Sequence, residues 1–257
     1  MFGERTRAAI TSALAAGIEV FIVTGRMFAS ARPYALAAGL DGPLVCYQGA
    51  FVAEAATGEE LHHEPIPLEL AHEAIEAIAS QGYSPNVYVD DVMYVSEHND
   101  HSRRYSSFQD VEVEEVGDLV AFLDQPPTKL VLVAQPGELA PVEDVLRDHF
   151  ASRMFIARSL PHFLEFAAEG VTKGSGLAFV AEHARFALEE TVAFGDGEND
   201  VELLEAAGFG VAVGDAHPRL QDVADWACAG PEEEGVAVVI ESLLEAQRAS
   251  ERRGQSY

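Results

Sequence analysis

The sequence predicts an α/β protein whose core is divided by an inserted α+β domain. Two observations lead to this expectation. Patterns typical of helices and of strands alternate near both ends of the chain, and the character of the sequence changes near Pro65 and changes back near Gly170. Buried parallel strands of α/β proteins appear as continuous apolar runs, as they do at both ends here. We therefore expect residues 1–64 and 169–257 to form one α/β core and residues 65–168 a separate α+β domain.

The segment before Pro65 alternates helix and strand. A helix is predicted by the spacing of apolar residues in "RTRAAITSALAAG", which stops at Gly17. The next run, "IEVFIVTG", is rich in β-branched residues and predicts a strand. A second helix, "MFASARPYALAAG", closes at Gly39, and "PLVCYQGA" has the length of a second buried strand.

The middle segment combines helices with alternating strands. A helix in "ELAHEAIEAIASQG" precedes "NVYVDDVMYV", in which Asp90 and Asp91 separate two alternating runs as in a β-hairpin. The strand "KLVLVA", the helix "PVEDVLRDHF" and the short runs "RMFIA" and "FLEFA" follow. This mixture is typical of an α+β unit.

The first pattern returns after Gly170. Helices are predicted in "GSGLAFVAEHARF" and "VELLEAAG", strands in "TVAFG" and "FGVAVG", and a closing helix in "VAVVIESLLEAQ". From Ser250 the sequence is polar, and we expect a frayed tail.

The composition excludes several kinds of partner. Sixteen Lys and Arg against 43 Asp and Glu give a net charge of −27, which repels nucleic acid and anionic membrane surfaces. The apolar runs are too short or too interrupted to cross a bilayer, and the two cysteines, Cys46 and Cys228, are expected to be buried thiols. These observations favour a cytoplasmic protein and leave its oligomeric state open. An anionic substrate would need local cations, helix N-termini or a metal ion.

An acidic turn, "GDGEND" at residues 195–200, follows a predicted strand and opens a helix. Asp196 comes directly after the strand, so its oxygens can converge with those of Asn199 and Asp200. A small set of hard oxygen ligands suits Mg²⁺, which keeps several waters and shares its shell with phosphate. The alternative is that Asn199 and Asp200 cap the helix while Glu198 is solvated.

Two further sites are candidates for binding an anion. Thr24, Gly25 and Arg26 lie at the end of the first predicted strand, where ligands bind in open α/β sheets. Lys173 lies among glycines just before a helix, where its ammonium group can approach an anion closely. The alternatives are an ordinary strand-to-helix turn with a capping Thr and a surface lysine.

Together these motifs resemble the haloacid dehalogenase superfamily, and within it the Cof-like (subfamily IIB) sugar-phosphate phosphatases, which carry a large cap domain. "VFIVTGR", "GVTKGSGL" and "VAFGDGENDVELLEAAGFGVAVGDA" resemble the second, third and fourth family motifs. "VCYQGAFV" resembles the strand after the second motif, although Gln48 stands where the family commonly has Asn. The resemblance covers nearly the whole chain. It implies a Rossmann-like core and assigns the inserted domain as the cap.

The resemblance also implies a role for each candidate residue. Thr24 and Lys173 would be catalytic, holding and neutralising the transferring phosphoryl group. Asp196 and Asp200 would form the metal site, with Asp200 and Asn199 orienting the Mg²⁺ shell. The substrate, a small phosphorylated metabolite, would be bound by Thr24, Gly25, Arg26, Lys173 and Asn199. Arg103, Arg104 and Tyr105 are candidates for lining the substrate pocket in the cap.

The chain departs from the family pattern in one respect. The family opens with a strand ending in Asp-x-Asp-Gly-Thr, whose first carboxylate attacks phosphorus and whose second protonates the leaving group. No Asp-x-Asp occurs in this sequence, and Met1, Phe2 and Gly3 run directly into the first predicted helix. Either the sequence is an N-terminally truncated form of an active enzyme, which we favour, or the protein binds phosphate or regulates without hydrolysis.

Overall fold

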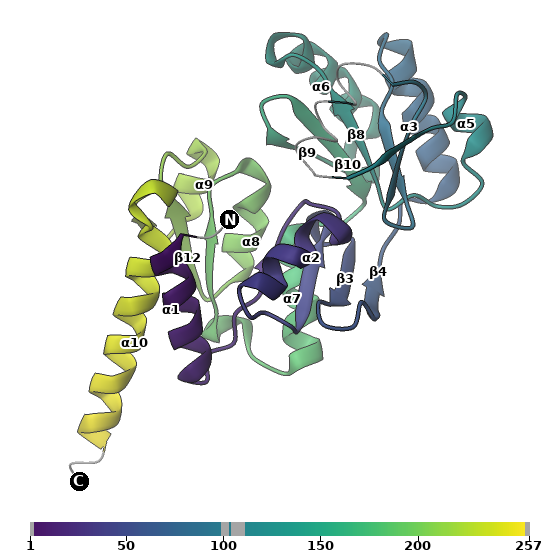
Figure 1. Ribbon diagram of the computed structural model, residues 1–257. Coiled ribbons are helices and arrows are strands. Elements are labelled where there is room, and N and C mark those ends of the chain that lie inside the picture. Colours follow the sequence, from purple (N-terminus) through teal and green to yellow (C-terminus); the bar gives the residue numbers. More distant parts are fainter. Residues whose placement is uncertain (1–2, 99–102, 104–110, 255–257) are drawn as a thin grey trace.

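The computed structural model describes residues 3–98, 103 and 111–254 (Figure 1). In this part of the chain the strands form three sheets. They have the strand orders β1-β2-β3-β4, β7-β6-β5-β8-β10-β9 and β11-β12-β13. All strands of the six-stranded sheet come from the middle of the chain, and the other two sheets come from the segments before and after it.

The N-terminal segment builds the four-stranded sheet. Its elements are α1 (Glu4–Ala15), β1 (Ile22–Val23), α2 (Phe28–Ala37), β2 (Pro43–Cys46), β3 (Phe51–Glu54) and β4 (Glu60–His63). Strand β1 pairs in parallel with β2, with Ile22 opposite Leu44, whereas β2, β3 and β4 are antiparallel. The predicted strand at "IEVFIVTG" is thus reduced to two residues, because the β2 strand on its one paired side meets it only there.

The middle segment forms the six-stranded sheet with helices on one face. Its elements are α3 (Leu68–Ser80), β5 (Asn86–Val89), β6 (Val92–Val95), β7 (Val113–Glu115), α5 (Leu119–Phe122), β8 (Lys129–Val133), α6 (Pro136–Phe150), β9 (Met154–Leu160) and β10 (Phe163–Ala168). Asp90 and Asp91 form the turn between β5 and β6 with φ values of 50° and 59°. Positive φ at both central residues matches the twist of a two-residue hairpin.

The C-terminal segment returns to parallel strands. Its elements are α7 (Lys173–Ala184), β11 (Val192–Gly195), α8 (Val201–Ala206), β12 (Phe209–Val213), α9 (Pro218–Val223), β13 (Trp226–Cys228) and α10 (Gly235–Gly254). Helix α10 continues past Ser250, where we expected a frayed tail, since the residues up to Gly254 include good helix formers. Cys46 is buried as expected, but Cys228 is only half-buried, because β13 is an edge strand.

Apolar clusters connect these units. One face of the six-stranded sheet packs on α3 and α6 through buried residues that include Ile78, Leu132 and Leu146. A second cluster joins side chains of β5, β6 and β8, among them Tyr88, to Met27 and Tyr47 of the N-terminal segment. The cap sheet therefore has helices on one face and contacts the core through the other. Within the described ranges, no helix combines the length and the apolar character that a membrane span requires.

Candidate active site

The loop of residues 24–26 connects β1 to α2 and is held by its neighbours. The Thr24 amide donates to Val45 O at 2.9 Å, and Thr24 O accepts from the Gln48 amide at 3.1 Å. The Thr24 hydroxyl accepts from the Arg26 amide at 3.2 Å, which gives the loop its sharp bend. The Arg26 guanidinium reaches Ser30 Oγ at 3.0 Å and lies 5.7 Å from the centre of the Tyr34 ring. The hydroxyl and the backbone of the loop are therefore in place, while the Arg26 side chain contacts α2.

Gly25 allows close packing in this loop. A Cβ atom at Gly25 would lie 2.3 Å from Gln48 Nε2, closer than any side-chain contact allows. The Gly25 carbonyl oxygen accepts a 2.7 Å hydrogen bond from Lys129 Nζ, which comes from β8 of the cap. A larger residue would separate the loop from both partners.

Asp200 organises the acidic turn that follows β11. Its Oδ2 atom accepts from the amides of Asp196 and Gly197 at 3.1 and 3.0 Å. Its Oδ1 atom accepts from Lys173 Nζ at 2.5 Å. Both side chains of this ion pair are about nine-tenths buried or more. Asp200 therefore joins the turn to the predicted lysine, and the Asp196 side chain is exposed beside it.

The position of Lys173 depends on glycines. Lys173 is the first residue of α7, whose N-terminus is capped by the Thr172 hydroxyl accepting from the Ser175 amide at 3.0 Å. A Cβ atom at Gly49 would lie 2.1 Å from the Thr172 carbonyl oxygen, and one at Gly174 would lie 2.2 Å from the Glu202 carbonyl oxygen. These close backbone approaches bring the start of α7 against the turn after β2 on one side and against α8 on the other.

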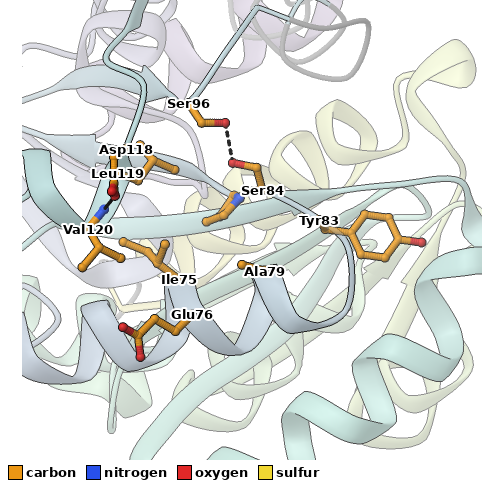
Figure 2. A pocket seen from close by; sticks show the side chains of 10 residues that line it. Ile75, Glu76, Ala79, Tyr83, Ser84, Ser96, Asp118, Leu119 and Val120 are labelled. Carbon is orange, nitrogen blue, oxygen red and sulfur yellow. Dashed lines mark hydrogen bonds between the residues drawn. The ribbon is translucent and has the colours of Figure 1, made fainter.

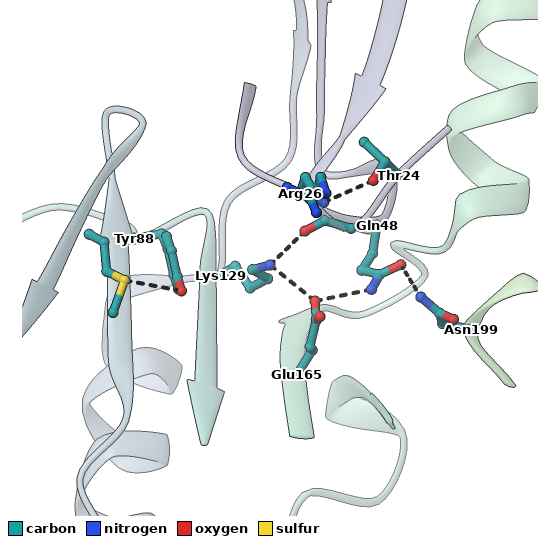
Figure 3. A network of polar contacts seen from close by, with 9 residues as sticks. Thr24, Arg26, Gln48, Tyr88, Lys129, Glu165 and Asn199 are labelled. Atoms are coloured by element: carbon teal, nitrogen blue, oxygen red, sulfur yellow. Dashed lines mark hydrogen bonds and ion pairs between the residues drawn. The ribbon is translucent and has the colours of Figure 1, made fainter. Parts of the chain in front are cut away.

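Asn199 is joined to the cap through Gln48 (Figure 3). Asn199 Nδ2 donates to Gln48 Oε1 at 3.0 Å, and Gln48 Nε2 donates to Glu165 Oε2 at 3.0 Å. Lys129 Nζ lies 3.1 Å from the same Glu165 oxygen. Our reading of the sequence did not identify Lys129 or Glu165. The available signal was a charged residue within each of the apolar strands "KLVLVA" and "FLEFA".

A second cap side chain contacts the core near the loop. The Asp91 carboxylate accepts from the amides of Phe28 and Ala29 at 3.0 and 2.7 Å and from the Tyr47 hydroxyl at 2.6 Å. Asp91 thus caps α2, whose own N-cap residue, Met27, makes no side-chain cap hydrogen bond. Burial raises the pKa of the Asp91 carboxyl, and the hydrogen bonds from Tyr47, Ala29 and Phe28 oppose that rise.

The predicted residues thus fall into two connected groups. Thr24 and Gly25 meet Gln48, which also binds Asn199; Lys173 meets Asp200 in the same turn. Of the three residues suggested for the cap pocket, Arg103 is exposed, and Arg104 and Tyr105 lie outside the described residues.

The turn can supply a hard oxygen ligand for a metal ion. Among the residues that the structure describes, no three His, Cys, Asp or Glu side chains form a metal-binding cluster. Both oxygens of Asp200 already accept hydrogen bonds from protein donors, whereas Asp196 is exposed. Mg²⁺ is commonly held by one or two carboxylates together with phosphate and water, so a site with one protein carboxylate, from Asp196, fits this ion.

A shallow groove in the cap is separate from these residues. It lies between α3 and α5 and is lined mainly by apolar atoms, with a 2.8 Å hydrogen bond between the Ser84 and Ser96 hydroxyls at one end (Figure 2). None of the residues predicted for the site lines it. The groove therefore plays no part in the candidate site.

Comparison with known proteins agrees with the motifs. The model of a family described as haloacid dehalogenase-like hydrolase matches residues 2–240. A 5-amino-6-(5-phospho-D-ribitylamino)uracil phosphatase of Bacillus subtilis is 31% identical over 228 residues, covering 86% of this chain and 83% of the relative. A pyridoxal phosphate phosphatase of Escherichia coli is 28% identical over 254 residues, covering 92% and 90%. A solved sugar phosphatase of subclass IIB has the same fold, with a TM-score of 0.81, 24% identity and coverage of 94% and 91%.

Proposed function

The chain belongs to the haloacid dehalogenase-like hydrolases, in the Cof-like subfamily IIB, and from this premise we propose that it is a Mg²⁺-dependent phosphatase of small phosphomonoesters of the sugar-phosphate type. The observation that carries the proposal is the buried contact of Lys173 Nζ with Asp200 at the turn that bears Asp196. A cation beside an exposed carboxylate suits a phosphoryl group and its counterion. The two relatives named above act, by their names, on small phosphorylated metabolites, which supports this substrate class.

Each residue has a defined task in this proposal. The Thr24 hydroxyl and the loop backbone at Gly25 and Arg26 bind the phosphoryl oxygens. Lys173, oriented by Asp200, neutralises the charge of that group as it is transferred. Asp196 would hold Mg²⁺, which when bound supplies positive charge to the phosphoryl oxygens. Asn199 binds the substrate from the acidic turn, and the cap keeps water away from the reacting group.

The nucleophile is not among these residues. Phosphoryl transfer through a covalent intermediate needs a carboxylate in line with the bond that breaks, and the sequence holds no Asp-x-Asp. We propose that the sequence is a truncated form and that the missing Asp-x-Asp strand inserts between β1 and β11. In the described part of the chain, β1 pairs with β2 alone and β11 with β12 alone, so each has an open edge. Val23 of β1 packs against the apolar cluster that contains Ala193 of β11, so both strands contribute to the same part of the core.

An assay on two forms of the protein tests the proposal. The chain of 257 residues and a form extended by the upstream coding sequence are compared on a panel of phosphomonoesters with Mg²⁺ or with EDTA. We expect the extended form to hydrolyse small sugar phosphates only when Mg²⁺ is present, with the first Asp of the added motif accepting the phosphoryl group. We expect little or no turnover by the shorter form, because its residues position a phosphoryl group without attacking it.

A second candidate function follows from the missing motif. A protein that keeps the loop of residues 24–26, Lys173 and the acidic turn without a nucleophile would bind phosphate or regulate another protein. An extended form that lacks activity on every ester, yet binds phosphate with Mg²⁺, would favour this function. EDTA-sensitive turnover by the chain of 257 residues would show instead that another nucleophile is present.

A further inference from the structure

A buried polar network crosses from the cap into the core (Figure 3). Lys129 lies at the start of β8 and Glu165 in β10, both in the cap, whereas Gln48 follows β2 and Asn199 belongs to the acidic turn. Their exposed fractions are 0%, 4%, 1% and 6%. Burying so many polar groups is unfavourable unless each finds a partner, so the network has to be satisfied internally.

Lys129 stands out by composition. The chain contains only two lysines, Lys129 and Lys173, among sixteen basic residues. Both are buried, each is paired with a carboxylate, and each lies beside a segment of the candidate site. The Lys129 ammonium also lies 5.4 and 5.1 Å from the ring centres of Tyr47 and Tyr88, which places a desolvated cation between aromatic faces at the junction of core and cap.

The cation determines the direction of every hydrogen bond that follows. An ammonium group can only donate, so Glu165 Oε2 accepts from Lys129 and, as an ionised oxygen, also accepts from Gln48 Nε2. With its amide nitrogen used, Gln48 presents Oε1 to Asn199, which must donate through Nδ2. The remaining oxygen of Asn199 is therefore directed to the turn, where a Cβ atom at Gly197 would lie only 2.4 Å from it.

We infer that Gln48 and Glu165 are positioning residues for the proposed phosphatase reaction: held by Lys129 of the cap, they orient the amide of Asn199 in the acidic turn. This inference rests on the proposed function. The network connects the cap directly to the site, because Lys129 Nζ also donates to the Gly25 carbonyl oxygen in the loop of residues 24–26. The arrangement of the loop and of Asn199 thus depends on the cap lying against the core.

Exchanging the two side chains tests the inference. Gln48→Glu places a second carboxylate against Glu165, and Glu165→Gln removes the Glu165 charge from its ion pair with the Lys129 ammonium. We expect each single change to weaken the binding of inorganic phosphate in the presence of Mg²⁺ about tenfold or more, measured by calorimetry on the full-length protein. The double variant Gln48→Glu/Glu165→Gln restores the net charge but not the hydrogen bonds, because the one atom of residue 165 that meets both partners cannot accept from Lys129 and also donate to the carboxylate at position 48. We therefore expect its affinity to stay about tenfold or more below that of the wild type.

Kinetics and a control variant separate positioning from stability. In the active, extended form, the single changes should lower kcat as well as phosphate affinity, and the double variant should recover neither. Glu73→Gln removes a carboxylate from another ion pair of the cap, with Arg153, and should leave phosphate affinity unchanged. If Gln48→Glu fails to fold, Gln48→Met removes the same hydrogen bonds without adding charge and should show the same loss.

Three results would overturn the inference. Folded single variants that bind phosphate as the wild type does, with only a lower unfolding temperature, would show a purely structural network. A folded double variant with the affinity of the wild type would show that the net charge of the network, and not the direction of its hydrogen bonds, is what matters. Absence of phosphate binding by the wild-type protein would overturn the proposed function and this inference with it. The inference alone fails when the wild type binds phosphate and the variants do not behave as expected.

Discussion

At the scale of single residues, the candidate site depends on a few groups with unlike environments. Lys173 and Asp200 form a buried pair, Asp196 is exposed beside them, and Arg219 forms an exposed pair with Glu198 in the same turn. A buried charge interacts strongly with its neighbours, whereas an exposed pair contributes little. Burial therefore makes Lys173 the cation suited to stabilise a phosphoryl group, whereas the exposed Arg219 is not.

Replacing Lys173 tests the role of the buried cation. In the form extended by the upstream coding sequence, we expect Lys173→Ala to lower kcat/KM by an amount equivalent to about 2 to 4 kcal/mol, because the transferring group loses its charge compensation. Arg219→Ala removes a cation from the same turn and is the matched control, with an expected change below about 1 kcal/mol. Equal effects of the two changes in steady-state kinetics would show that Lys173 has no special role.

Replacing Asp196 tests the proposed metal ligand. We expect Asp196→Asn to raise the Mg²⁺ concentration needed for half-maximal activity about tenfold or more, since a neutral amide is a weaker ligand than a carboxylate. Glu198→Gln removes a neighbouring charge of the same sign that is already paired with Arg219, and it should shift the Mg²⁺ titration far less. A titration that is the same for Asp196→Asn and the wild type would exclude Asp196 as a ligand.

At the scale of elements, close contacts between backbones position the site. Helix α7 begins against the turn after β2 because Gly49, with φ of 107°, has no side chain to separate them. Cap and core are joined at α2 by a side chain instead, because Asp91 from the β5–β6 turn supplies the capping carboxylate. Elements distant in sequence therefore provide each other's capping and packing groups.

An ion pair between elements of the cap gives a testable dependence on pH. Glu73 of α3 binds Arg153 and His149 near the end of α6, and the hydrogen bond from Arg153 lowers the pKa of Glu73 to about 2 from its ordinary value of 4.5. A lowered folded-state pKa means that the stabilisation is complete above pH 4.5 and is lost as the pH falls through 2.

We therefore expect Glu73→Gln to lower the unfolding midpoint in denaturant at neutral pH. The difference from the wild type should shrink between pH 4.5 and pH 2. Glu76→Gln, at an exposed position of the same helix, is the control and should change the midpoint little at any pH. A difference for Glu73→Gln that does not vary with pH would mean that its ionisation is not what stabilises the cap.

At the scale of the whole molecule, one continuous middle segment builds the six-stranded sheet, and the chain passes between it and the other sheets near Pro65 and Gly170. Glu64 and Glu169 are exposed at these two crossings. The division into a core of residues 1–64 and 169–257 and a cap of residues 65–168 stays a prediction. Polar and apolar contacts join the two parts, so their separation has to be tested in solution.

Limited proteolysis with a protease of broad specificity tests the division. We expect early cleavage near Pro65 and Gly170, releasing a protected fragment of the middle segment, because exposed connections between domains are cut before packed helices. Phosphate with Mg²⁺ should slow both cuts if it holds the cap against the core. Fragments arising only near the C-terminus would contradict the division.

The sequence by itself determined the class of the fold, the hairpin at Asp90 and Asp91, and the family, because these depend on local patterns and on motifs of contiguous residues. Its motifs also indicated Thr24, Lys173 and the acidic turn, since each follows or precedes a recognisable strand or helix. The side chains from other segments that contact these motifs could not be predicted from the sequence. Lys129 and Glu165 appear in the sequence only as charges within apolar strands, and their partners lie on other segments, 36 to 117 residues away for Glu165.

Only the tertiary structure decided which groups face one another. It closed the chain from Lys129 through Glu165 and Gln48 to Asn199, assigned Asp200 to Lys173, and placed the Asp91 carboxylate at the start of α2. It also showed that β1 and β11 each have an open edge in the described chain. The physical reason is that hydrogen bonds and ion pairs of this kind depend on distances of about 3 Å between segments far apart in sequence, and only the packing of sheets and helices sets those distances.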